Sequence, residues 1–484
     1  MAFIRKVKTG SGAIAVQIIH KAHGQIIKLE HLGSAHHQTN LEALIALAKQ
    51  RLRGNQLSLL PEFASPLRIR LKQSVSQLLY DSLLGLYDQL GFFKLKDEAF
   101  TALVIARLVE PTSKLDSLRV LADLGITNHS NTSIHRCLKR IITDKYRDKL
   151  AKLCFAQASA QKGGITLVLY DVTTLYFEVQ QEDDYRKPGL SKERRLEPQI
   201  VVGLLVDQSG FPLEIQSFEG NKAETKTILP VIEAFKTKHQ LAEMTVVADA
   251  GMMSANNLEA LADAGHRYIV GSRLTKIPYD LAEYQKIREL ADGQIVTSKL
   301  ESSQRVIYQY RAKRAALDHR NIEKQISKAE RILSGTAQNK TTRFLSVKTG
   351  EKQLNQALIT KAKALAGIKG YVTNSDIPDE QVISHYHQLW QVEQSFRMSK
   401  SDLKARPIFH RKQEAIEAHL TVVFTALAIG RLIEQRISFS IPRLVKLLRP
   451  IRTGTVMINE TAYLAEPEIP EKVSEILKQL KTGY

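Results

Sequence analysis

The chain has 484 residues, enough for about three domains of ordinary size. With 43% hydrophobic and 25% charged residues, 25 Gly and 14 Pro, its composition excludes collagen, a long disordered chain and a disulfide scaffold. Lys and Arg number 69 against 50 Asp and Glu, and the resulting net charge of +19 fits a polyanionic partner such as nucleic acid.

The compartment is indicated by what the sequence lacks. No apolar run approaches the roughly 18 residues needed to cross a bilayer, and the first ten residues lack the apolar core of a signal peptide. Two cysteines, Cys137 and Cys154, are too few for a disulfide framework or a cysteine-ligated metal site. We therefore expect a soluble protein of a reducing compartment that does not contact a membrane.

The positive charge is concentrated in two parts of the chain. Residues 1–75 hold 11 Lys or Arg against three acidic residues, and residues 394–413 hold six against one. Each cluster alone is also typical of a solvated surface. Together they favour an extended anionic ligand, because a long polyanion needs distributed neutralisation.

The first predicted elements are strands. Residues 3–7, 13–19 and 25–29 have strand-like composition and are separated by glycine turns, which predicts a small basic meander. A helix is predicted over 41–53. Residues 54–66, with two prolines, are typical of a linker.

The region after the linker is predicted to be almost wholly helical up to about residue 160. One helix is capped by Thr112 and ends before Gly125, and a second begins near Asn131. The apolar stripe of the second helix leaves a basic face on the other side, formed by His135, Arg136, Lys139 and Arg140. A helix-turn-helix presents such a face to a major groove, with Arg136 and Lys139 as candidate DNA contacts. An ordinary bundle helix with a solvated face has the same pattern, and both interpretations stay open.

A change to strand periodicity marks the next region. Buried strands are predicted where β-branched apolar runs occur, and two of them are followed by Asp171 and Asp249. The order is strand, strand, strand, helix, strand, helix, strand, at residues 165–170, 200–206, 213–218, 226–239, 244–248, 255–264 and 267–270. Three strands before the first helix are unusual for a doubly wound sheet and are expected of an α/β, ribonuclease-H-like fold.

The order is then interrupted. Residues 272–368 contain two predicted strands and a charged helix, which we interpret as a β-containing insertion. The core resumes with a strand and two helices, predicted at 370–374, 380–399 and 412–435.

Aspartates that follow buried strands are candidate metal ligands, because the carboxyl edge of an open α/β sheet is where its sites lie. Hard divalent ions prefer carboxylate oxygens, and a two-ion site needs about three carboxylates. Glu393 is the candidate for the third. Its helix face carries, at spacings of 3, 4, 4 and 3, Tyr386, Leu389, Glu393, Arg397 and Lys400. The face can also be explained as a surface salt bridge between Glu393 and Arg397.

Three segments resemble the catalytic blocks of Asp–Asp–Glu transposases, nearest to those of the bacterial insertion-sequence family four: residues 167–174, 247–252 and 386–393. The third block of that group reads Tyr, two residues, Arg, three residues, Glu, six residues, Lys. Tyr386, Glu393 and Lys400 fall on these spacings. The resemblance spans about residues 165–430.

The resemblance implies that Asp171, Asp249 and Glu393 bind two Mg²⁺ or Mn²⁺ ions, and that Lys400 and Tyr386 contact phosphates of the element ends. Leu389 departs from the pattern because it occupies the Arg position, and that role is left vacant or passes to Arg397. Metal-dependent cleavage of double-stranded DNA and strand transfer into target DNA are implied. So are a homodimer on paired ends and a bacterial, cytoplasmic, nucleoid-associated location.

Two alternative functions remain open. A metal-dependent nuclease or phosphatase would need a similar set of carboxylates, and a DNA-binding protein that has lost catalysis would keep the basic surfaces. The expected organisation is a basic β-rich region at 1–60, a helical DNA-binding domain at 67–160, a first core part at 163–271, an insertion at 272–368, a second core part at 369–440 and a helical tail at 441–484.

Overall fold

The computed structural model divides the chain into two compact units, Met1–Ile69 and Arg70–Tyr484, which are described separately. The structure describes residues 2–9, 13–22, 24–35, 38–53, 69–160, 165–178, 181–189, 197–272, 282, 289–300, 304–336, 342–348, 351–458 and 461–482. The linker predicted at 54–66 lies outside these residues.

The N-terminal unit is a three-stranded antiparallel sheet with one helix. Its elements are β1 (Ala2–Lys8), β2 (Ile14–Ala22), β3 (Gln25–Ala35) and α1 (Gln38–Arg53). Val16 and Ile18 of β2 are buried together with Leu41 and Ala48 of α1, so the helix covers one side of the sheet. The predicted meander and the helix that follows it are confirmed.

The larger unit begins with a strand and five helices: β4 (Ile69–Val75), α2 (Gln77–Gln89), α3 (Glu98–Val109), α4 (Ser117–Asp123), α5 (Asn131–Thr143) and α6 (Tyr146–Ser159). A short 3₁₀ turn at Phe92–Leu95 separates α2 from α3. Cys137 and Cys154 are free and buried within this helical region. The predicted helical character is confirmed, whereas strand β4 is not predicted by the sequence pattern.

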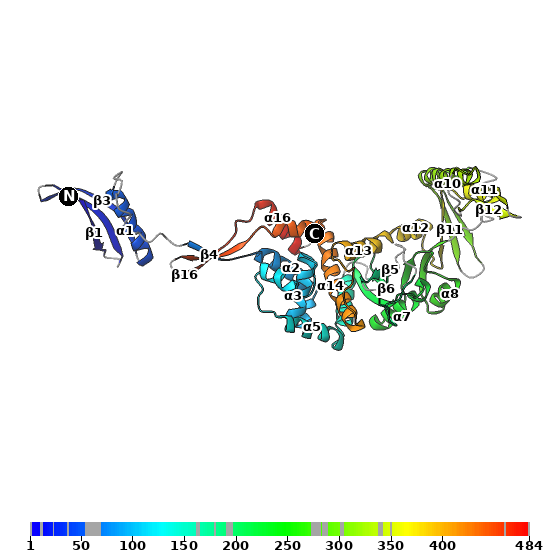
Figure 1. Ribbon diagram of the computed structural model, residues 1–484, viewed down its shortest axis with the longest axis horizontal. Coiled ribbons are helices and arrows are strands. Elements are labelled where there is room, and N and C mark those ends of the chain that lie inside the picture. The colour runs from blue at the N-terminus through cyan, green and yellow to red at the C-terminus, as the bar shows by residue number, and fades with distance from the viewer. Residues whose placement is uncertain are drawn as a thin grey trace. The chain divides into compact units, whose positions relative to one another are not determined.

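An eight-stranded mixed sheet forms the centre of the larger unit (Figure 1). Its order is β10-β11-β14-β9-β8-β5-β6-β7. The strands are β5 (Leu167–Tyr176), β6 (Gln199–Val206), β7 (Pro212–Glu219), β8 (Thr245–Ala248), β9 (Arg267–Ser272), β10 (Ile295–Lys299), β11 (Arg305–Tyr310) and β14 (Ile368–Thr373). β5, β6 and β7 are antiparallel, while β8 and β9 run parallel to β5. The mixed α/β class is thus confirmed.

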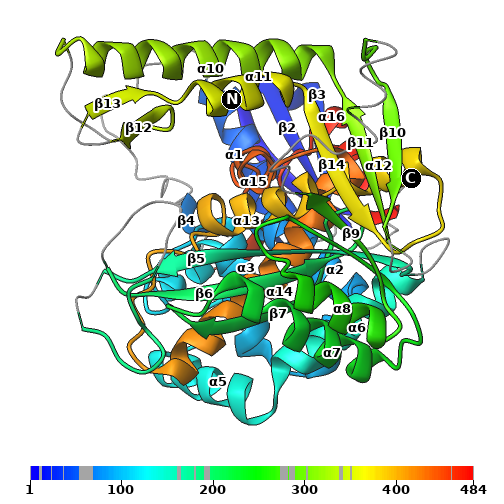
Figure 2. The same ribbon diagram turned by 90° about the vertical axis from the view of Figure 1, so that its right-hand side faces the viewer.

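Helices lie on both sides of strands β5 and β6 (Figures 1 and 2). After a short 3₁₀ turn at Glu224–Lys226, α7 (Ile228–His239) and α8 (Ala255–Asp263) lie together on one side. α12 (Asp379–His387) and α13 (Trp390–Ser401) lie on the other side, where α13 packs against β5 and β6. Residue Glu393 is therefore brought to the sheet by packing of its own helix.

The region expected to be an insertion has two parts. Strand β11 pairs with β14 and β10 pairs with β11, so both extend the central sheet, in place of the separate insertion expected at 272–368. The second part has its own small core and contains α10 (Ala312–Leu333), β12 (Leu345–Lys348), β13 (Glu351–Leu354) and α11 (Gln356–Ala364). Ile322 of α10, Phe344 and Ile359 of α11 are buried together there, and Figure 2 shows α10 along the top of this layer.

One apolar helix, α14 (Gln413–Ile437), connects the helical region to the sheet. It packs against α3, α5, α13 and β7. By length and composition α14 is apolar enough to cross a membrane, so the expectation that no segment reaches this threshold is wrong. Of its most apolar 18-residue window, 94% is buried inside the protein, as expected of a central core helix.

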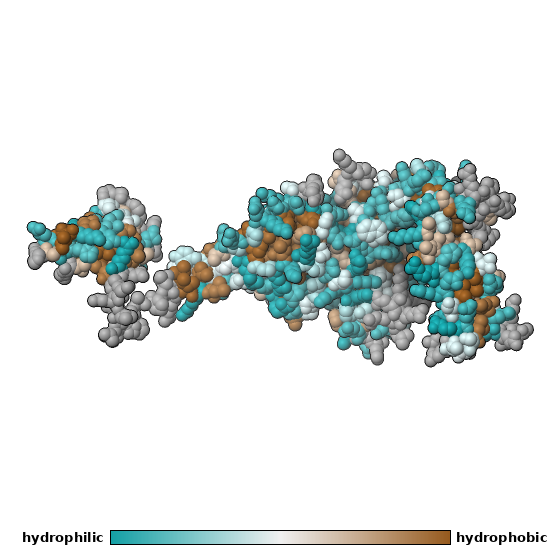
Figure 3. Space-filling model, turned by 90° about the horizontal axis from the view of Figure 1, so that it is seen from above, coloured by the Kyte–Doolittle hydropathy of each residue, from teal (hydrophilic) through white to brown (hydrophobic). Residues whose placement is uncertain are grey.

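The tail was expected to be helical, and this is wrong in part. Between α15 (Ile441–Leu448) and α16 (Glu471–Thr482) lies a hairpin of β15 (Thr453–Ile458) and β16 (Thr461–Ala465), and β15 pairs with β4. Threonines and alternating apolar residues give both segments strand propensity, and β4 supplies a distant pairing partner. Leu71 and Leu464 are 65% and 66% exposed on this sheet. Figure 3 shows brown, hydrophobic atoms over the sheet of β4, β15 and β16.

Candidate active site

The two aspartates are aligned by the register of adjacent parallel strands. β5 pairs with β8 from Leu167 opposite Thr245 to Leu169 opposite Val247. Asp171 and Asp249 each lie two residues further on, so both come to the same edge of the parallel pair. The prediction that the first strand ends at Asp171 is wrong, because residues 172–176 continue β5 by pairing with β6.

Glu393 lies in the first turn of α13, which begins immediately after a break in the predicted helix. The sequence predicts one helix over 380–399, whereas the structure has α12 and α13. At the junction the backbone N–H groups of Gln388 and Leu389 donate to carbonyls three residues back, as in a 3₁₀ turn. No proline or glycine marks this tighter turn in the sequence.

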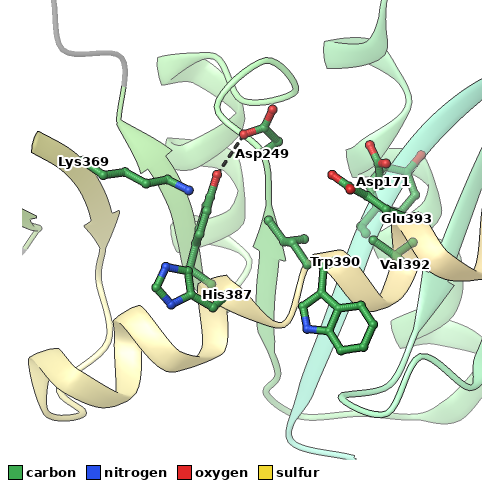
Figure 4. Close-up of a pocket in the computed structure, with 10 residues that line it drawn as sticks. Asp171, Asp249, Lys369, His387, Trp390, Val392 and Glu393 are labelled. Carbon is green, nitrogen blue, oxygen red and sulfur yellow. Dashed lines mark hydrogen bonds between the residues drawn. The ribbon is translucent and has the colours of Figure 1, made fainter. Parts of the chain in front are cut away.

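All three acidic side chains line one cavity of about 280 Å³, here called the acidic cavity. Its wall also contains Lys369, Tyr386, His387, Leu389 and Trp390. In Figure 4 the carboxylates of Asp171 and Glu393 lie side by side, and Asp249 lies apart from them. In the described part of the chain no three His, Cys, Asp or Glu side chains are close enough together to form a metal site. The carboxylates therefore share a cavity but are not gathered around one point.

Tyr386 holds Asp249 in this position. The Tyr386 hydroxyl donates a hydrogen bond of 2.8 Å to Asp249 Oδ1 (the dashed line in Figure 4). Burial of the Tyr386 side chain raises the pKa of its hydroxyl, and the neighbouring Asp249 carboxylate raises it further. Tyr386 therefore acts as a hydrogen-bond donor to the second aspartate.

Lys369 of β14 is a further cation in the acidic cavity, and no sequence pattern singles it out. Its Nζ lies 4.3 Å from the centroid of the Tyr386 ring, a cation–π distance. Burial, followed by repulsion from Arg314, lowers the pKa of Lys369, and the carboxylates of Asp249 and Glu393 oppose that shift. A single lysine in a strand has no distinguishing sequence signal, because an exposed strand face gives the same pattern.

A second cavity, of about 360 Å³, shares two walls with the first. Asp171 and Glu393 line both, and the second also contains Arg397, Lys400 and Arg406. We call it the mixed-charge cavity. The predicted helix face of Glu393, Arg397 and Lys400 is thus found along one wall. Arg406 was not singled out by sequence, although it belongs to the basic segment 394–413.

Leu389, at the position of the signature arginine, is the N-cap residue of α13 and lines the acidic cavity. Arg397, the expected substitute, lines only the mixed-charge cavity. The cation on the acidic-cavity side is Lys369, supplied by a different element. On the acidic-cavity side, Leu389 is thus accompanied by Lys369 of β14 and not by Arg397.

The residues predicted to contact DNA on α5 lie away from both cavities. Arg136 and Lys139 are exposed and line neither one. The cap of α5 is Ser130, which forms a capping box with Ser133, and not Asn131. The preceding helix, α4, starts at Ser117, and its N-cap residue is Asp116. Thr112 donates a hydrogen bond to the Asp116 side chain and does not cap the helix.

Arg140 of the same helix has a structural role. Its guanidinium donates two hydrogen bonds, of 2.9 and 2.8 Å, to the buried carboxylate of Asp97. Asp97 also caps α3 by accepting from the Phe100 backbone N–H, and it accepts from the Tyr146 hydroxyl. The basic face of α5 therefore consists of His135, Arg136 and Lys139.

The comparisons with known proteins give a family match over the region that holds this site. A family model described as a transposase DDE domain matches residues 162–429, and no curated protein matches. One similar solved structure is the cryo-EM structure of a piggyBac transposase synaptic complex with hairpin DNA, at a TM-score of 0.41 and 10% identity, covering 77% of this chain and 70% of that one. By the family match, which spans more than half of its length, the chain belongs to the transposase DDE domain family.

Proposed function

We propose that the protein is the DNA transposase of a bacterial insertion sequence and that Asp171, Asp249 and Glu393 form its metal-binding centre. The observation that carries the proposal is that the three carboxylates, from β5, the end of β8 and α13, line one cavity of a DDE-family chain. The strand order β9-β8-β5-β6-β7, in which only β6 runs opposite to β5, supports a ribonuclease-H-like core.

The donor set fits divalent cations of the Mg²⁺ or Mn²⁺ type. All three groups are carboxylates, the ligands that hard cations prefer. Asp171 and Glu393 already lie side by side, while Asp249 must turn from the Tyr386 hydroxyl to join them. When bound, a pair of ions would supply Lewis-acid stabilisation at the attacking and leaving oxygens of a phosphodiester.

The cationic side chains would position the DNA backbone across the two cavities. Arg397, Lys400 and Arg406 stand on one side of the Asp171–Glu393 pair and Lys369 on the other. A backbone lying over this pair would meet a cation on each side. Positioned cations on the transferring phosphate stabilise charge that develops in the transition state.

The proposed reaction has two steps at one site. Water attacks the phosphodiester at the element end and frees a 3′-hydroxyl, and this hydroxyl then attacks a phosphodiester of the target DNA. The second step exchanges one phosphodiester for another, so no covalent protein–DNA intermediate is needed. We extend the proposal to a homodimer on paired ends in the cytoplasm, associated with the nucleoid, with DNA contacts also on α5 and on the basic N-terminal unit.

The test is a transposition assay with a plasmid that carries a marker between the two DNA segments flanking this reading frame. Wild-type protein with Mg²⁺ is expected to give strand-transfer joints. Asp171→Asn, Asp249→Asn and Glu393→Gln are expected to abolish cleavage but to retain binding to the flanking DNA. The matched control is Glu380→Gln, because Glu380 is an exposed residue of α12 that lines neither cavity.

Each other outcome rejects a defined part of the proposal. Nicks without joints would make the protein a nuclease. A wild-type protein that binds DNA without Mg²⁺-dependent cleavage would be a DNA-binding protein that has lost catalysis. Joints formed by Asp249→Asn at the wild-type rate would remove that residue from the metal centre.

A further inference from the structure

Four basic side chains meet where the helical region packs against α14, away from the three carboxylates. Lys114 Nζ lies 2.7 Å from His419 Nδ1, and the rings of His410 and His419 are 5.6 Å apart between centroids. The fourth is Arg107 of α3, whose positive charge acts on both histidines. We call Arg107, Lys114, His410 and His419 the basic cluster. The members come from α3, the segment after it, the segment before α14, and α14 itself.

The hydrogen bonds define the state of His419. Its Nε2 is 3.1 Å from the backbone carbonyl oxygen of Ala405, which can only accept, so Nε2 carries the proton. Nδ1 is then free of a proton and accepts from the Lys114 amino group. His419 is therefore a neutral imidazole between a lysine and a carbonyl.

The basic cluster has no acidic counterpart. Arg107 and His419 are only 7% and 4% exposed. Across the described ranges of the chain, neither Arg107 nor Lys114 forms an ion pair with a carboxylate. Buried charges are almost always paired, because removing a charge from water is costly. A mostly buried arginine without a carboxylate partner, beside a lysine and two histidines, therefore requires an explanation.

Every charged group that acts on these histidines is basic. Burial, followed by repulsion from Lys114, Arg107 and His135 of α5, lowers the pKa of His410 to about 4. Burial, then Lys114, Arg107 and His410, lower the pKa of His419, and only the carbonyl of Ala405 opposes this. The pKa of Lys114 is also lowered by burial and by Arg107. Repulsion inside the basic cluster is thus relieved by loss of protons.

The basic cluster adjoins both surfaces assigned to DNA. Ala405, which accepts from His419, directly precedes Arg406 of the mixed-charge cavity. His135, which acts on His410, directly precedes Arg136 on the exposed face of α5. Lys114 and His410 are partly exposed, which puts part of the basic cluster at the protein surface.

We infer that the basic cluster is a phosphate-binding site that takes a backbone phosphate of DNA lying between the mixed-charge cavity and α5. The inference rests on the proposed function for the identity of the ligand, whereas the chemistry requires only a phosphate group. A phosphate supplies the negative charge that the fold omits, and it favours the protonated forms of His410 and His419. Binding is therefore coupled to proton uptake.

The experiment measures binding of the full-length protein to a 30-base-pair duplex in EDTA, where no cleavage occurs, so that its result does not depend on catalysis. Salt dependence is measured by fluorescence anisotropy, and proton uptake by calorimetry at pH 6.5 in two buffers of different ionisation enthalpy. The variants are Lys114→Met and the milder His410→Gln, each checked for folding by its melting temperature. The matched control is Lys152→Met, an exposed lysine of α6.

Loss of one phosphate contact is expected to reduce the slope of log K against log salt by about 0.9 in Lys114→Met. His410→Gln is expected to reduce the proton uptake, and Lys152→Met to change neither quantity. A second arm measures inorganic phosphate by its effect on the melting temperature. Stabilisation of wild type but not of Lys114→Met, with unchanged DNA binding, would assign the site to free phosphate. If both variants match wild type for duplex, proton uptake and inorganic phosphate, the inference is wrong.

Discussion

The acidic cavity and the basic cluster both contain several side chains of like charge, but in opposite environments. In the acidic cavity Asp249 and Glu393 are exposed, and Tyr386 and Lys369 supply a hydrogen bond and a positive charge. The basic cluster is largely buried and contains no carboxylate. In the acidic cavity, water and the neighbouring Lys369 reduce the repulsion between the carboxylates. In the basic cluster, loss of protons reduces the repulsion between the basic groups.

This contrast indicates two ways in which a folded protein can hold several like charges together before the ligand binds. Holding like charges together lowers the free energy of unfolding. Such clusters are therefore expected at functional sites, where a ligand of opposite charge offsets the repulsion when it binds. An exposed set of carboxylates keeps its charge screened by solvent. A buried basic set must change its protonation when the ligand binds. The two regions should therefore respond differently to substitution.

The largest expected effect is at the acidic cavity. Glu393→Gln should reduce cleavage by about a thousandfold or more, because a ligand of the proposed metal centre is lost. In EDTA the same variant should melt at or above the wild-type temperature, because one of three like charges is removed. A loss of both activity and stability would show that Glu393 is needed for folding. It would contradict the idea that repulsion between carboxylates in the acidic cavity lowers stability.

Lys369→Met should slow strand transfer by about 10- to 100-fold, since a positioned cation contributes in this range when charge develops on a phosphate. Lys369→Arg should restore part of the rate if positive charge is the contribution. Lys361→Met on α11 is the control, because Lys361 is exposed and lines neither cavity. Equal rates for Lys369→Met and the control would exclude Lys369 from the site.

The ion pair of Arg140 with Asp97 lies in the same helical region and provides a paired charge with which the basic cluster can be compared. Arg140→Met should lower the free energy of unfolding by about 2–3 kcal/mol, because it leaves the buried Asp97 carboxylate with fewer donors. Arg136→Met, on the exposed face, should change it by less than about 0.5 kcal/mol. Urea denaturation of both variants measures the difference, and similar values would mean that the pair contributes little.

Much of the active-site edge could be predicted from sequence because its determinants are local. Apolar runs identify the strands before Asp171 and Asp249, and parallel strands in register bring such residues to one edge. Helical spacing places Glu393 on a face with Arg397 and Lys400, and the structure keeps this face along one wall of the mixed-charge cavity.

The missed features depend on long-range contacts. Lys369 lies in a strand whose place beside β9 is set by pairing, and Lys114 meets His419 from 305 residues away. His419 on an apolar helix is indistinguishable by pattern from a core histidine. The hairpin β15–β16 likewise acquires its sheet from β4, and the turn between α12 and α13 has no glycine or proline to mark it.

The smallest expected effect is on α5, where exposed cations are proposed to contact phosphates. The double variant Arg136→Gln, Lys139→Gln should reduce the slope of log K against log salt by up to about 1.8, since each phosphate contact contributes about 0.9. Proton uptake should stay at the wild-type value, because this face contributes arginine and lysine side chains where the basic cluster contributes buried histidines. An unchanged slope would leave α5 as an ordinary bundle helix, and a change in proton uptake would show that the two surfaces are not independent.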